Sequence, residues 1–153
     1  MSEIKRIHDQ LRRAFEGTAW HGPSLKEILA DISSDKAAAN PIPGLHSIWE
    51  IVLHITAWDG IVKRRLGGEI VEPSDQEDWP AIQDRSDQAW GQAVQELERG
   101  HQALRETVSL IDDARLAEIV PGTNYSVYFM LHGVIQHDLY HAGQIALLKK
   151  AQG

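Results

Sequence analysis

Hydrophobic residues recur every three or four positions over most of the chain, which is the period of an amphipathic α-helix. A first helix is predicted from one such face, formed by Ile4, Ile7, Leu11, Ala14 and Phe15. No segment alternates hydrophobic and polar residues with the period of two that is typical of a β-strand. The pattern therefore predicts an all-α fold.

Capping motifs predict where the next helices begin and end. Residues 24–27 form a capping box, which opens a short accessory helix that is expected to reach about Ile32, and residues 37–44 form a loop. A second capping box at residues 47–50 opens a long helix. This helix is expected to end before the glycine pair at residues 67–68, because glycine favours the C-cap conformation.

The second half of the chain predicts two more long helices. After an acidic, irregular stretch, a third long helix begins between Pro80 and Ser86 and presents a regular seam, formed by Trp90, Val94, Leu97, His101, Leu104, Val108 and Ile111. Thr123 or Asn124 is expected to cap a last helix that ends near Lys150. Four long helices with one short helix predict an antiparallel four-helix bundle. The chain has 153 residues and no internal repeat, so residues 1–153 are expected to form a single domain.

Composition excludes several classes of function. Fifteen basic against 22 acidic residues give a net charge of −7, which disfavours nucleic acid and anionic membrane surfaces as partners. The absence of cysteine excludes disulfides, thiolate metal sites and cysteine nucleophiles. The charged N-terminus lacks the apolar core of a signal peptide, and no apolar run approaches the ~18 residues of a membrane span. A cytoplasmic protein is expected.

The chemistry is expected at the histidines of the last helix. His137 and His141 are four residues apart and fall within its hydrophobic stripe, so both rings can point at one ion. Buried imidazoles lose solvation unless they have a partner, and a shared metal supplies one. The alternative is that each ring forms a hydrogen bond with a carboxylate or carbonyl inside the bundle.

A third ligand must come from another helix, because a catalytic metal usually has three protein ligands and an open position. His54, His101 and His8 are the candidates, and helix spacing does not choose among them. The helix that carries His54 also carries Trp49 and Trp58, which could line a pocket but are expected to pack in the core.

Four polar residues near these histidines have simpler expected roles. Glu50 lies one turn before His54 and could serve as a carboxylate ligand or base, but it is expected to be the capping-box glutamate of its helix. Asp59 and Asp138 are expected to be solvated or to form hydrogen bonds with a ligand side chain. Gln144 borders the same face as His137 and either orients a ligand or packs as an ordinary polar residue.

Two segments resemble the DinB-like superfamily. Residues 47–58, SIWEIVLHITAW, are similar to its second-helix segment, and residues 133–145, GVIQHDLYHAGQI, are similar to its fourth-helix segment. The resemblance implies a four-helix bundle with up-down-down-up connections, commonly assembled as a homodimer. It also implies a metal site of three histidines, which are His54, His137 and His141 here. It gives His101 no role.

Members of this superfamily resemble metal-dependent hydrolases or transferases that join low-molecular-weight thiols to electrophiles. The resemblance therefore implies a metal-dependent enzyme with a small-molecule substrate, which is a thiol in the second case. Imidazole ligands suit zinc or nickel first, with iron or manganese as further candidates. No catalytic residue beyond the ligands is assigned. The alternative is a non-enzymatic, dimeric bundle that binds a metal or ligand, because no acid–base pair is evident.

Overall fold

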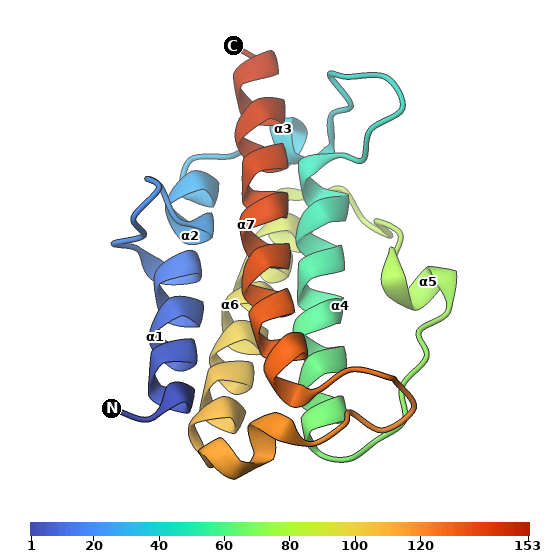
Figure 1. Ribbon diagram of the computed structural model, residues 1–153. Helices are drawn as coiled ribbons and strands as arrows, with labels where there is room; N and C mark the ends of the chain where they lie inside the picture. The colour runs from blue at the N-terminus through green and yellow to red at the C-terminus, as the bar shows by residue number, and fades with distance from the viewer.

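The computed structural model describes all 153 residues and consists of helices joined by turns and loops (Figure 1). The four long helices are α1 (Glu3–Glu16), α4 (Ile48–Leu66), α6 (Asp87–Ser109) and α7 (Val127–Ala151). The shorter elements are α2 (Leu25–Leu29), α3 (Ser34–Ala38), α5 (Asp75–Asp78) and the 3-10 helix η1 (Asp113–Ala117). The predicted all-α fold is confirmed.

The four long helices pack side by side, with α4 and α1 each in contact with both α6 and α7. In Figure 1, α1 and α7 run up the page and α4 and α6 run down it. The neighbours α4 and α6 are therefore parallel, which differs from a simple antiparallel order. The long connection that carries α5 allows this arrangement, because it returns the chain to the other end of the bundle before α6 begins.

Serine residues begin all four long helices. Ser2, Ser47, Ser86 and Ser126 each accept a hydrogen bond from a backbone N–H in the first turn of the following helix. At α4 the exchange is reciprocal, because the Glu50 carboxylate accepts the Ser47 backbone N–H at 2.7 Å. The predicted capping role of Glu50 is confirmed.

The cap of the last helix was predicted wrongly. Thr123 and Asn124 lie in the turn that precedes α7, and the cap is Ser126. The Thr123 hydroxyl is engaged within that turn, where it donates to the Val120 carbonyl at 2.8 Å and accepts from the Tyr125 N–H at 3.3 Å. The Thr123 hydroxyl therefore does not cap α7.

More short helices form than the single accessory helix that was predicted. The helix predicted to reach Ile32 ends at Leu29, and α3 follows it. α5 occupies part of the stretch that was expected to be irregular. In both cases a serine, Ser33 or Ser74, caps a helix of one turn that is too short to show periodicity.

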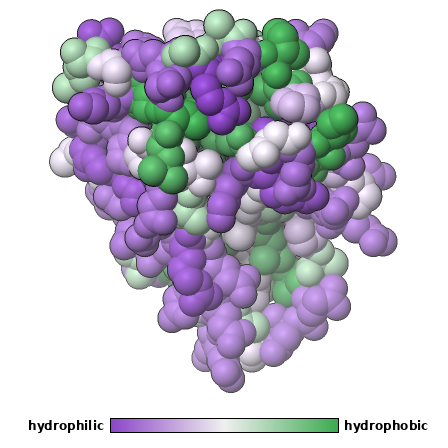
Figure 2. Space-filling view, turned by 90° about the horizontal axis from the view of Figure 1, so that it is seen from below, coloured by the Kyte–Doolittle hydropathy of each residue, from purple (hydrophilic) through white to green (hydrophobic).

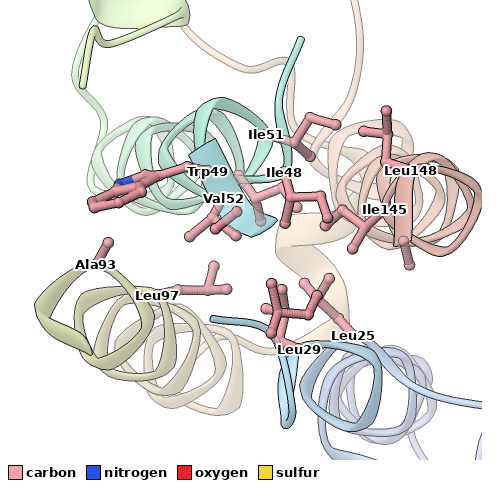
Figure 3. Close-up of a cluster of buried hydrophobic side chains, with 14 of the residues drawn as sticks. Leu25, Leu29, Ile48, Trp49, Ile51, Val52, Ala93, Leu97, Ile145 and Leu148 are labelled. Carbon is pink, nitrogen blue, oxygen red and sulfur yellow. The ribbon is translucent and has the colours of Figure 1, made fainter. Parts of the chain in front are cut away.

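Two clusters of buried hydrophobic side chains form the core, one towards each end of the bundle. The first joins α2 and α3 to the start of α4, the start of α6 and the end of α7. Figure 3 shows its central members, Leu25, Leu29, Ile48, Val52, Leu97 and Ile145, meeting between these helices. The second joins α1 and η1 to the opposite ends of α4, α6 and α7. Along α4, α6 and α7, the buried ionisable residues Asp59, His101 and Asp138 lie between the residues of the two clusters.

Seen from below, the end of the bundle is covered mainly by hydrophilic residues, with hydrophobic ones exposed in separate patches (Figure 2). The exposed hydrophobic residues near this end include Ile70, Leu110, Ile119 and Phe129. None of the helices combines the length and the apolar character that a membrane span requires.

Candidate metal centre

Three histidines from two helices converge at one point. α4 carries His54, and α7 carries His137 and His141, one helical turn apart. The Nε2 atom of His137 lies 2.9 Å from Nε2 of His54 and 3.1 Å from Nε2 of His141. One ligand atom from each ring lies within 4.8 Å of the other two. The structure therefore brings together the three histidines that the family resemblance selected.

Hydrogen bonds determine which ring nitrogens face this point. His54 Nδ1 lies 2.6 Å from the Asp78 backbone carbonyl oxygen, and His141 Nδ1 lies 2.6 Å from Oε1 of Gln144. Both partners can only accept, so each Nδ1 carries a proton and each Nε2 presents a lone pair. His137 has one Nε2 proton at most and can satisfy only one of these lone pairs. A cation shared by the three nitrogens fits this donor set.

Burial keeps the three rings neutral. It is the largest cause that lowers the pKa of His54 and of His141 below the ordinary 6.5. For His137, burial, then His141 and then His54 lower the pKa to about 3. Metal ions bind neutral imidazole, so the cluster is in its ligand form at neutral pH.

Sequence reasoning missed Asp78, which holds His54 from a separate element. Besides its backbone carbonyl, its carboxylate Oδ1 lies 3.2 Å from His54 Nδ1 and accepts the Trp58 indole N–H at 2.7 Å. Trp79, the next residue, stacks on the His54 ring with the ring centres 3.8 Å apart. The capping box that starts at Ser74 was the available signal for α5, although it does not say what α5 contacts.

A cavity of about 500 Å³ opens beside the histidines. Its walls are mainly apolar and aromatic, with Arg65 and Tyr125 among the polar residues. The lining comprises His54, Trp58, Val62, Arg65, Asp78, Trp79, Tyr125, Phe129, Met130, Gly133, Val134, His137, Tyr140 and His141. An ion held by the three rings would therefore face a space large enough for a small organic molecule.

The structure separates His101 from this cluster. His101 is fully buried and stacks on Phe15, with ring centres 4.1 Å apart, and its Nε2 lies 3.4 Å from Oδ2 of Asp138. Asp59 and Asp138 are both buried, and neither carboxylate has a hydrogen-bond partner within the protein. Asp59 and Asp138 were expected to be solvated or to form hydrogen bonds with a ligand side chain, and both expectations are therefore wrong. Burial and the neighbouring Asp138 raise the pKa of Asp59 well above its ordinary value.

Gln144 orients His141 through the hydrogen bond described above. Trp49 packs in the core as expected, whereas Trp58 lines the cavity, so the packing role predicted for Trp58 is wrong. His8 is half-buried on α1 and lines no part of the cavity.

Comparison with known proteins agrees with this site. A family model described as the DinB superfamily matches residues 18–145, a range that includes all three clustered histidines. No match was found among curated proteins or among solved structures. Fold and histidine cluster together are compatible with a metal-binding protein. Because the matched range spans well over half of its length, the chain belongs to the DinB superfamily.

Proposed function

We propose that this protein is a metal-dependent enzyme in which His54, His137 and His141 hold one divalent ion. The observation that carries the proposal is the convergence of three neutral imidazoles, two of them oriented through their Nδ1 atoms, beside an apolar cavity. Three nitrogen ligands with room beside them are typical of catalytic rather than structural sites. All-imidazole ligation favours zinc or nickel, with iron and manganese next.

The reaction proposed is either hydrolysis or transfer of a low-molecular-weight thiol to an electrophile. A divalent ion supplies Lewis acidity, which activates a water or thiol and polarises a substrate oxygen. The protein's own residues have two further tasks. Asp78 and Gln144 fix the orientation of His54 and His141, and the apolar wall that includes Trp58 and Met130 limits access of water.

One observation favours a second, non-enzymatic function. The cavity wall contains one carboxylate, Asp78, whose Oδ1 already accepts the Trp58 indole N–H and lies 3.2 Å from His54 Nδ1, so the wall has no carboxylate apart from the one that holds a clustered histidine. A metal- or ligand-binding bundle needs no general base. This alternative predicts metal binding and ligand binding without turnover.

The two functions are separated by an activity screen on the metal-loaded protein. The substrates are a series of p-nitrophenyl esters and a thiol paired with an aryl halide. Turnover that is abolished by a chelator and by His137→Ala, but retained in the exposed-histidine control His21→Ala, supports the enzyme. Metal-dependent thermal stabilisation with no turnover on either substrate class contradicts it and favours the binding module.

A further inference from the structure

The cavity contains a buried positive charge that the proposed metal chemistry does not use. The Arg65 side chain lines the cavity, and the residue is only 9% exposed. Its Nε and Nη2 donate to the Val71 carbonyl oxygen at 3.3 and 2.7 Å, and its Nη1 donates to the Tyr125 hydroxyl at 2.7 Å. A guanidinium has five N–H donors, so two remain for another acceptor.

Arg65 has no counterion in the protein. Both of its partners are neutral, and no carboxylate lies within ion-pair distance. Its neighbour Arg64 shows the ordinary arrangement, because it is half exposed and pairs with Glu69 at 2.9 Å. Burying a cation without an anion costs free energy. The protein has 22 acidic residues and a net charge of −7, yet none of these carboxylates pairs with Arg65. Such a group in a cavity wall points to an anionic ligand.

Arg65 and the histidines lie at different ends of the same cavity. His54 and Arg65 are eleven residues, or about three turns, apart and therefore lie on one face of α4. Their backbone positions are separated by about 16 Å along the helix axis. Trp58 lies between them. The Arg65 guanidinium carbon is 5.6 Å from the centre of the Trp58 ring, and the His137 ring centre is 6.0 Å from it. One face of the cavity thus runs from a cation across an indole to the metal ligands.

We propose that Arg65 binds the anionic end of the substrate and so restricts it to amphiphilic organic anions. The ligand class is a small molecule with a carboxylate, sulfonate or phosphate at one end and an apolar body. Trp58, Phe129 and Met130 contact that body. The reacting group at the other end reaches the three histidines, and this part of the inference rests on the metal site proposed above. Positioning by Arg65 fixes the distance from the anion to the ion.

The test compares the binding of 5-phenylpentanoate with that of 5-phenylpentanamide, which has the same shape without the charge. Calorimetry at low salt measures both ligands on the protein as purified and after chelator treatment, which removes direct ligation of the carboxylate by the metal. The variants are Arg65→Met, Arg65→Lys and the adjacent control Arg64→Met. Arg64→Met removes the same charge from the exposed side of α4. Metal content and helical circular dichroism check that each variant is folded.

The expected result is that the acid binds roughly tenfold or more tightly than the amide in wild type and Arg64→Met. This preference should disappear in Arg65→Met, remain in part in Arg65→Lys, and survive chelator treatment. Equal binding of acid and amide by wild type overturns the proposal, as does an unchanged preference in Arg65→Met. If Arg65→Met alone loses the preference for the acid, but neither wild type nor any variant contains metal, the anion site is upheld and the metal-dependent function is refuted.

Discussion

His54 donates its Nδ1 proton to the backbone carbonyl oxygen of Asp78, 2.6 Å away and 24 residues further along the chain. This hydrogen bond leaves the His54 Nε2 lone pair facing His137. The connection between α4 and α6 therefore has two effects. It returns the chain so that α6 can run parallel to α4, and it orients one of the three clustered rings.

The matching contact on α7 predicts how tightly the site binds metal. Replacing Gln144 by leucine removes the acceptor for His141 Nδ1 and frees the ring to rotate or change tautomer. Losing such a partner typically weakens metal binding about 10- to 100-fold. Competition with a chromophoric chelator measures the affinity, with Gln136→Leu on the exposed side of α7 as the control. Equal affinities for the two variants would show that Gln144 does not orient a ligand.

The pKa of His137 predicts how the metal-free protein responds to acid. In the folded chain His137 takes up its proton only near pH 3, whereas in the unfolded chain it does so near 6.5. Between these values the unfolded state binds more protons, so the free energy of unfolding falls as the pH is lowered from 6.5. His54 and His141, whose pKa values are also lowered, act in the same direction.

Chelator-treated protein should therefore lose stability relative to the His137→Gln variant, measured as the urea midpoint, as the pH falls from 7.5 to 5.5. The difference arises because the variant lacks one group that takes up a proton on unfolding. Parallel pH profiles for the two proteins would contradict the lowered pKa of His137.

The buried carboxylate of Asp59 predicts the opposite dependence. Its folded-state pKa is raised by burial and by Asp138, so the folded protein keeps a proton that the unfolded chain loses above about pH 4. Stability is therefore lost as the pH rises from that value until the folded-state pKa is reached. Asp59→Asn removes this loss. Urea denaturation at pH 5 to 8 should show the variant gaining stability over wild type as the pH rises, and a constant difference would refute the raised pKa.

An exposed hydrophobic face of α7 is consistent with the homodimer that the family resemblance implies. Tyr140 and Leu147 are each about two-thirds exposed, and their spacing of seven residues places them on one side of the helix. We propose that two copies meet on this face. Sedimentation should show a dimer in wild type that Leu147→Glu dissociates, while Gln92→Glu, on the exposed side of α6, leaves it intact. A wild-type monomer at high concentration would exclude this assembly.

Local patterns in the sequence predicted the long helices and two of the three clustered histidines. The capping box at Ser47 and the glycines after Leu66 predicted both ends of α4, and the four-residue spacing predicted that His137 and His141 share a face. These features depend on neighbouring residues alone. The choice of His54 over His101 came from the family resemblance, because both lie near the middle of a long helix.

What could not be predicted depends on contacts between distant segments. Asp78 reaches His54 only because the connection after α4 folds back along that helix. Asp59 and Asp138 are exceptions, because each stands at helical spacing within a buried hydrophobic stripe, and only the charge of an aspartate side chain suggested exposure to solvent. The sequence also does not show that Arg65 lacks a counterion, because its neutral partners Val71 and Tyr125 are known only from the folded structure.

The central claim is that three particular histidines hold one ion, and the metal content of untagged protein tests it most directly. Plasma mass spectrometry of wild type, His54→Ala and His101→Ala should find about one divalent ion per chain in wild type and His101→Ala and none in His54→Ala. Both replaced rings are buried, but only His54 belongs to the cluster. Metal retained without His54 and lost without His101, or absent from wild type even after reconstitution, would contradict the account.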